Sequence, residues 1–155
     1  MNFQIRTAQM ADGEQMLALM PRLAEFDVPV SRDPEHLWRD DARLMQSWLD
    51  GDAADCLVQV AVSDTEILGF TLVRLREELL SHVPSSHLEA IAVSKSAEGQ
   101  GVGLALLNAA EENARSHGAQ SITLHVFASN TRAREFYERN NYSGELLRYI
   151  KDFTE

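Results

Sequence analysis

The sequence has few of the residues that mark several specialised protein classes. Its 155 residues include 1 Cys, 4 Pro and 8 Gly, which excludes a disulfide-stabilised scaffold and a collagen-like chain. The single cysteine, Cys56, has no internal disulfide partner, and we expect a reducing, cytoplasmic setting. Basic residues are also scarce, with 14 Lys+Arg against 24 Asp+Glu and a formal net charge of −10. This acidity argues against binding to nucleic acid or to an anionic membrane.

Long hydrophobic runs are missing as well. No run approaches the roughly 18 apolar residues that a transmembrane helix needs. The N-terminus has no basic start followed by an apolar stretch, so no signal peptide is expected. Hydrophobic residues make up 45% of the chain and charged residues 25%, which is typical of a folded globular protein. Since no linker, repeat or low-complexity tract divides the sequence, it predicts a single domain over residues 1–155.

Hydrophobic spacing and turn residues predict the order of the secondary-structure elements. Strands are expected at residues 3–6, 56–62, 67–75, 88–93, 122–126 and 142–153. Helices are expected from Asp12 with a break near Pro21, from Ser31 or Asp33 to Gly51, over residues 102–117, and from Asn130 to Asn140. A loop is expected at residues 81–86. Hairpins followed by a β-α-β unit indicate an α/β (α+β mixed) fold, with one mixed sheet covered by helices.

The most informative stretch is residues 88–107, LEAIAVSKSAEGQGVGLALL. A predicted buried strand runs into a loop in which Gly99, Gly101 and Gly103 alternate, and a helix follows. Alternating glycines allow a tight turn with several backbone N–H groups pointing the same way. Those groups and the dipole of the following helix favour an anion. The pattern therefore predicts a binding loop for a phosphate or pyrophosphate.

Other readings of this loop fit less well. A Walker loop ends in Gly-Lys-Ser/Thr, which the sequence does not contain. The dinucleotide fingerprint requires a glycine at position 104, which is Leu104. A nucleotide-binding domain remains an alternative that competition by ATP or NAD would reveal. A glycine-rich turn that caps a helix without any ligand is another, although three alternating glycines exceed what a cap needs.

The segment Glu98-Gly99-Gln100-Gly101-Val102-Gly103 resembles the Arg/Gln-x-x-Gly-x-Gly/Ala motif of the GCN5-related N-acetyltransferase (GNAT) superfamily. The resemblance covers nearly the whole chain in element order and is specific over residues 88–142. It implies a central mixed, mostly antiparallel sheet of six to seven strands, flanked by four helices, with a splayed strand pair at the cofactor site. It also implies acetyl-coenzyme A (acetyl-CoA) as the co-substrate.

The same resemblance implies which residues hold the cofactor. The strand residues Ile91, Ala92 and Val93 would pair with the pantetheine arm, in the manner of β-augmentation. The pyrophosphate would lie on the backbone N–H groups of Glu98, Gly99, Gln100, Gly101, Val102, Gly103 and Leu104. Glu98 departs from the family, which has Arg or Gln there, because an anionic side chain should repel a pyrophosphate. The candidates to offset this charge are Lys95, Arg132 and Arg134.

A second matching run lies downstream. Residues Asn130 to Tyr137 resemble the family's Asn…Ala…Tyr run, and helical spacing places Ala133, Phe136 and Tyr137 on one face. The resemblance implies that Asn130 contacts the pantetheine arm and that the Tyr137 hydroxyl lies by the thioester sulfur. Tyr137 as a core aromatic is the alternative. The family's usual Gly-Phe is Asn141-Tyr142 here, and Asn tolerates a left-handed turn.

Acetyl transfer to an amine needs acid–base groups, because an alkyl amine with a pKa of about 10.4 is protonated at neutral pH. Glu89 lies inside the apolar run LEAIAV and is the predicted base, since burial raises the pKa of a carboxylate. A Glu on the open face of the strand, or one bonded to Arg74, is the alternative. His87 and His125 are other candidate bases. Tyr137 would act as the general acid for the leaving thiolate, and a backbone N–H near Val93 would stabilise the oxyanion.

Residues 25–55 are rich in acids, which favours a cationic small-molecule or lysine-like protein amine as acceptor. The residues are Glu25, Asp27, Asp33, Glu35, Asp40, Asp41, Asp50, Asp52 and Asp55. A solvated acidic helix is the alternative reading, and Trp38 and Trp48 are expected in the core. The sequence thus predicts an acetyl-CoA-dependent N-acetyltransferase without a metal, or alternatively a non-catalytic acyl-CoA-binding sensor or regulatory module. A homodimer is compatible with either, because dimers are common among similar folds.

Overall fold

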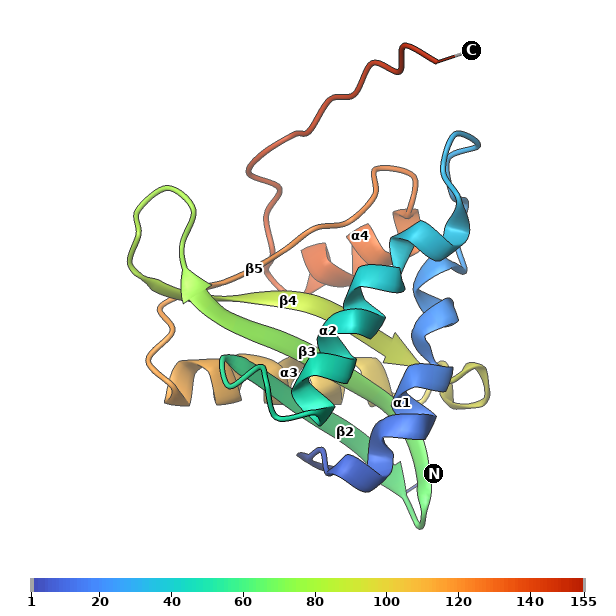
Figure 1. The fold of residues 1–155 in the computed structure, drawn as a ribbon, viewed down its shortest axis with the longest axis vertical. Coiled ribbons are helices and arrows are strands. Elements are labelled where there is room, and N and C mark those ends of the chain that lie inside the picture. Colours follow the sequence, from blue (N-terminus) through green and yellow to red (C-terminus); the bar gives the residue numbers. More distant parts are fainter. Residues whose placement is uncertain (1, 155) are drawn as a thin grey trace. The chain divides into compact units, whose positions relative to one another are not determined.

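The computed structural model describes residues 2–154, and the chain forms two compact units (Figure 1). The first unit ends at His125 and holds the sheet and three α-helices. The second begins at Val126 and holds one α-helix. The sequence expectation of a single domain over residues 1–155 stays a prediction.

The sheet of the first unit has five strands in the order β1-β2-β3-β4-β5. Their bounds are Gln4–Thr7 (β1), Cys56–Ser63 (β2), Glu66–Glu77 (β3), Pro84–Val93 (β4) and Ile122–Leu124 (β5). The first four strands pair antiparallel in succession, and β5 lies parallel to β4. A mixed, mostly antiparallel sheet is confirmed, but the expected six to seven strands are wrong, since the described residues form five.

The missing strand is the one predicted for residues 142–153, which form neither strand nor helix. Their aromatic and β-branched side chains suit a strand, but a strand also requires a neighbouring backbone to complete its hydrogen bonds. Two boundaries also differ. β4 begins at Pro84 rather than at Leu88, because Pro84 opposes Glu77 and proline is tolerated at the first residue of a strand. β5 ends at Leu124, before Val126.

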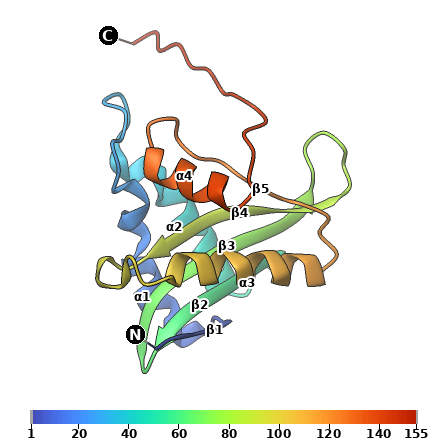
Figure 2. The ribbon, with the colours of Figure 1, turned by 180° about the vertical axis from the view of Figure 1, so that it is seen from behind.

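Helices cover both faces of the sheet (Figures 1 and 2). On one face, α1 (Gly13–Ala18) and α2 (Arg39–Leu49) pack on a core that includes Met16, Met45 and Phe70. Trp38 and Trp48 are partly buried against this core, as predicted. On the other face, α3 (Val102–Ser116) packs through Val102 and Leu106 on Ala61 and Leu68. Each face of the sheet is therefore covered by its own hydrophobic cluster.

Short 3-10 helices join these elements, namely η1 (Met10–Asp12), η2 (Met20–Ala24), η3 (Pro34–Leu37) and η4 (Lys95–Ala97). The predicted break near Pro21 is confirmed, since α1 ends at Ala18 and η2 continues with Pro21 near its start. The loss of a backbone N–H at proline explains why the α-helix does not continue.

The second unit contains α4 (Thr131–Arg139), which brings the observed number of α-helices to the expected four. The Asn130 side chain caps it by accepting a hydrogen bond from the Ala133 N–H at 3.3 Å. Asn141 has φ +70°, and the Tyr142 N–H donates to the Tyr137 carbonyl at 3.0 Å. The predicted cap and the predicted left-handed turn are both confirmed.

Candidate functional site

The strands β4 and β5 separate after a short paired stretch. They pair only from Ser86 to Leu88 on β4, and beyond Leu88 the described residues leave that edge of β4 without a neighbouring strand. The Ser94 N–H donates to the Leu68 carbonyl of β3 at 2.7 Å. Because backbone groups alternate along an antiparallel strand, those of Ile91 and Val93 point away from β3, toward the open edge. This is the splayed strand pair that the resemblance implied.

The glycine loop (residues 98–104) follows this edge directly. Gly99 has φ +75° and Gly101 φ +81°, a backbone conformation that favours glycine, and a Cβ built on either would meet nothing within 4 Å. The space beside both glycines is therefore open. Among the described residues, no side chain caps the start of α3 at Gly101. The first N–H groups of α3, from Val102 to Leu104, have no partner within the helix and are available to an anion.

The other predicted cofactor residues lie along the same path. Ala92 of β4 and Val102, the first residue of α3, have side chains buried in the core, so each can offer only backbone groups. The Gln100 side chain donates to the Ser96 carbonyl at 3.3 Å, which holds the loop in place. Leu104 is exposed on the first turn of α3. The structure thus joins residues 91–93 to residues 98–104 by a short connection that contains η4.

Arg22 on η2 contacts both ends of this connection, and it was not predicted from the sequence. Its Nε donates to the Val93 carbonyl oxygen at 2.9 Å. Its guanidinium also pairs with Glu98 and, at 2.8 Å, with Glu25. Lys95, one of the residues expected to offset Glu98, is exposed on η4 instead. No local sequence signal identifies Arg22, because it lies 76 residues before Glu98.

Glu89 occupies a β-bulge. The register of β3 and β4 places Leu72 opposite Ala90 and Val73 opposite Leu88, so Glu89 is the extra residue. A bulge redirects a side chain, and Glu89 is half-buried. Its charge acts on Asp41 of α2 and on Cys56 of β2, so Glu89 lies on the side of the sheet covered by α2.

Asp41 is the second carboxylate on this side. It lies one helical turn before the buried Met45, so helical spacing turns it toward the sheet. Burial, followed by the charges of Glu89 and Asp40, raises the pKa of Asp41 to about 7. The sequence analysis counted Asp41 only as one of many acids. Its spacing to Met45 was the available signal that it faces inward.

The two histidines considered as bases lie close together near β5. Their ring centroids are 4.8 Å apart, and His87 Nδ1 lies 2.7 Å from the Thr123 hydroxyl. Burial, then the charges of His125 and Arg76, lowers the pKa of His87 to about 4. His87 is therefore neutral at pH 7 and only a weak base.

Asn130 and Tyr137 belong to the second unit, and their place relative to β4 stays a prediction. Within that unit, the Tyr137 ring packs against Phe136 and edge-on against Tyr142, with centroids 5.4 and 5.6 Å apart. Burial raises the pKa of Tyr137 to about 12. The hydroxyl therefore keeps its proton at neutral pH, as a general acid requires. Arg134 donates to the Ala128 carbonyl at 3.0 Å within the same unit.

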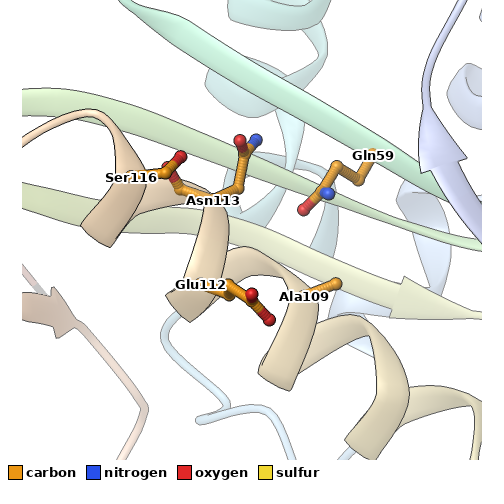
Figure 3. Close-up of a pocket in the computed structure, with 5 residues that line it drawn as sticks. All are labelled: Gln59, Ala109, Glu112, Asn113 and Ser116. Carbon is orange, nitrogen blue, oxygen red and sulfur yellow. The ribbon is translucent and has the colours of Figure 1, made fainter.

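A separate pocket lies between α3 and β2 (Figure 3). It has a volume of about 270 Å³ and is lined by Gln59, Ala109, Glu112, Asn113 and Ser116. It contains none of the predicted site residues, so we place the candidate site at β4 and the glycine loop. Within residues 2–154, no group of three or more His, Cys, Asp or Glu side chains is placed to hold a metal ion. The described helices include none long and apolar enough to cross a membrane.

Comparisons with known proteins identify what the chain is similar to. The model of the acetyltransferase (GNAT) family matches residues 19–142. Among solved structures, a Pyrococcus furiosus protein assigned as an acetyl transferase is 26% identical with a TM-score of 0.79, and the match covers 98% of this chain and 100% of that one. No curated protein sequence matches.

Two further solved structures share the fold at lower identity. A transcriptional regulator from Bacillus halodurans C-125 is 23% identical with a TM-score of 0.73, over 98% of this chain and 100% of that one. Glucosamine-6-phosphate N-acetyltransferase from Arabidopsis thaliana is 20% identical with a TM-score of 0.68, over 99% of this chain and 100% of that one.

Proposed function

Because the chain belongs to the acetyltransferase (GNAT) family, we propose that it transfers an acetyl group from acetyl-CoA to a primary amine. One observation carries the proposal. The open edge of β4 beyond Leu88 leads directly into the glycine loop at the start of α3. An extended amide chain can add to such an edge, and an anion is favoured at such a helix start.

The residues present fit acetyl-CoA, which when bound would supply the activated thioester. The outward backbone groups of Ile91 would hold the pantetheine arm, together with the Val93 carbonyl, whose second lone pair stays open beside Arg22. The diphosphate would lie against the N–H groups of residues 98–104, beside the open space at Gly99 and Gly101. The fit depends on backbone groups, so it does not require a basic side chain at position 98.

The proton of the incoming ammonium would pass to the two carboxylates beside the open edge. We assign the base to Glu89, which the bulge turns to the side of α2. Asp41, with its pKa of about 7, gains and loses a proton readily at neutral pH, so it can pass the proton from Glu89 on to solvent. The free amine then attacks the thioester carbonyl, with the Val93 N–H as the oxyanion donor.

Release of the thiol completes the reaction. The carbon–sulfur bond breaks, and the thiolate takes a proton from the Tyr137 hydroxyl. The raised pKa of Tyr137 means that the phenol is protonated when the thiolate forms, although it is a weaker acid than an exposed tyrosine. Asn130 is assigned to the pantetheine arm by the family pattern alone, since its side-chain oxygen already caps α4.

We propose a cationic amine as the acceptor. Several acids of residues 25–55 already have basic partners within the protein: Arg22 for Glu25, His36 for Asp33, Arg43 for Asp40 and Arg74 for Asp55. Asp41 and Glu89 have no hydrogen bond or ion pair among the described residues, which leaves their charge to attract a ligand. Their position on one side of β4 would direct the amine toward the thioester.

The test is release of free thiol from acetyl-CoA in the presence of polyamines, aminoglycosides and lysine peptides. We expect release with at least one of these, at a rate that falls as salt screens the attraction. A rate that is the same for every amine and insensitive to salt would remove the support for a cationic acceptor. If none of the polyamines, aminoglycosides or lysine peptides causes thiol release, the proposal of acetyl transfer to an amine is contradicted.

A second candidate function is a non-catalytic acyl-CoA sensor. The observation that favours it is Glu98, an acid at the position where family members have Arg or Gln. Binding of acetyl-CoA without thiol release in the presence of any amine would support this function. Thiol release that depends on Glu89 would exclude it.

We also propose that two copies of the chain associate through residues 146–153. These residues expose large apolar side chains, with Leu147 81%, Tyr149 86% and Phe153 88% exposed. Such a run of exposed apolar residues marks an interaction surface. Size-exclusion chromatography with light scattering should show a dimer, and the double substitution Leu147→Ser and Tyr149→Ser should shift it to monomer. A monomeric wild-type protein would contradict the proposal.

A further inference from the structure

Arg22 connects its own segment to the end of β4 and to the start of the glycine loop, 71 and 76 residues later in the sequence. It belongs to η2, and its Nε donates to the carbonyl oxygen of Val93 at the end of β4, at 2.9 Å. One terminal nitrogen pairs with Glu98 at the start of the glycine loop, and the other pairs with Glu25 on its own segment at 2.8 Å. The Arg22 side chain is 19% exposed, against 32% for Glu98 and 48% for Glu25.

The planar guanidinium of arginine suits the contacts with Val93 and Glu98. Val93 and Glu98 are the two ends of the connection that contains η4, and a planar guanidinium can bind a carbonyl on one side and a carboxylate on another. Lysine, with a single charged nitrogen, cannot hold both in fixed directions. Pro21 lies near the start of the short 3-10 helix from which Arg22 extends. Arg22 therefore fixes the distance between the end of β4 and the glycine loop.

We propose that the Arg22–Glu98 pair is the positioning element of the acetyl-CoA site, so that Glu98 anchors the glycine loop rather than repelling the diphosphate. This inference rests on the proposed function. Arg22 compensates the charge of Glu98 locally, and the N–H groups of residues 99–104 remain available for the anion. Glu25 pairs with the other terminal nitrogen of the same guanidinium, is the more exposed of the two carboxylates and lies outside the glycine loop.

The effect of Glu98→Gln on the affinity for acetyl-CoA distinguishes an anchoring role of Glu98 from simple charge repulsion. If Glu98 only hindered the diphosphate, Glu98→Gln, which restores a residue typical of the family, would tighten acetyl-CoA binding. If Glu98 anchors the loop, the same substitution frees the loop from Arg22 and weakens binding. Glu98→Arg would weaken it further, because two cations would then face each other.

The experiment compares the whole protein with five variants, one of which is the Glu98→Arg substitution described above. Glu98→Gln and Arg22→Lys each break the anchoring contact, and the second keeps the charge. Glu25→Gln is the matched control, because it removes the other carboxylate partner of the same guanidinium and leaves Glu98 in place. The double substitution R22E/E98R reverses the pair. The measurements are the Kd for acetyl-CoA by calorimetry and the hydrogen exchange of the amides of residues 99–104.

We expect Glu98→Gln and Arg22→Lys to raise the Kd for acetyl-CoA about three- to tenfold, the range for a charge-assisted contact of roughly 1 kcal/mol. The loop amides should exchange faster in both. Glu25→Gln should stay within about twofold of wild type, as expected for an exposed pair. R22E/E98R should bind more tightly than Glu98→Arg alone. The KM for the amine should be unchanged in Glu98→Gln, because the contact lies on the cofactor side.

Tighter or equal binding of acetyl-CoA by Glu98→Gln would overturn the proposal, as would an equal loss in Glu25→Gln. The hydrogen-exchange measurement separates this failure from that of the proposed function. If the wild-type protein does not bind acetyl-CoA, the proposed function fails. Faster exchange of the loop amides in Glu98→Gln than in Glu25→Gln would then still support the anchoring contact, and equal exchange would refute it.

Discussion

The charge of Glu89 at the bulge of β4 acts on Asp41 of α2, although the two residues lie 48 positions apart in the sequence. Burial and the negative charge of Glu89, with Asp40 contributing less, raise the pKa of Asp41 to about 7. Two carboxylates in one half-buried place rarely hold two charges at neutral pH, and a group that exchanges a proton near pH 7 suits acid–base catalysis.

Glu89→Gln should lower kcat by about a hundredfold, the usual contribution of a positioned base. It should also move the acidic limb of the pH–rate profile to lower pH, because loss of the Glu89 charge lowers the pKa of Asp41. The steady-state rate between pH 5 and 9 measures both. Asp40→Asn, at an exposed acid paired with Arg43 at 3.3 Å, should leave the rate within about twofold. An unchanged profile in Glu89→Gln would remove Glu89 as the base.

Asp41→Asn should stabilise the fold at neutral pH but not at acidic pH. The folded-state pKa of Asp41 lies above its ordinary value of 3.8, so ionisation disfavours the folded state. Below about pH 4 the buried Asp41 is protonated and costs the wild type no free energy of unfolding. As the pH rises from there to the folded-state pKa of about 7, the wild type loses stability relative to the variant. Melting temperatures at pH 4 and pH 8 test this. The variant should exceed wild type by a few degrees, roughly 2–4 °C, at pH 8 only. An equal difference at both pH values would contradict the assigned burial of Asp41.

Tyr137→Phe should lower kcat and leave the Kd for acetyl-CoA within about twofold, since only the proton donor is lost. Stopped-flow measurement of thiol release, combined with calorimetry, separates the two quantities. Tyr142→Phe is the control, because its ring packs edge-on against Tyr137 at 5.6 Å but is assigned no proton transfer. Equal activity of Tyr137→Phe and wild type would show that another group protonates the thiolate.

The glycine loop and its flanking strand and helix were predictable because their signals are local. Gly99 and Gly101 have the positive φ values that explain their identity, and Asn130 caps α4 through its immediate neighbours. The family resemblance drawn from this segment is confirmed by the match over residues 19–142. Hydrophobic patterns likewise predicted all five observed strands, with boundaries that differ mainly in β4 and β5, and this was enough to predict the sheet type.

The residues that the sequence analysis missed depend on tertiary contacts. Arg22 acquires its role from Val93 and Glu98, more than 70 residues away, and Asp41 acquires its pKa from burial beside Glu89. The strand predicted at residues 142–153 was wrong for the same reason. Periodicity reports which side chains suit a strand, but not whether a neighbouring backbone is present to pair with it.

The central claim is that the glycine loop binds acetyl-CoA, and the melting temperature with added ligand tests it most directly. A ligand at 100 times its Kd stabilises the folded state by about 2.7 kcal/mol, which is a rise of roughly 2–8 °C. Gly101→Ala and Gly51→Ala are matched variants, since both glycines have positive φ with open space around them. We predict that acetyl-CoA raises the melting temperature of wild type and Gly51→Ala but not of Gly101→Ala, and that ATP and NAD raise none of them. No rise of the wild type at millimolar acetyl-CoA, or an equal rise with ATP, would contradict the account.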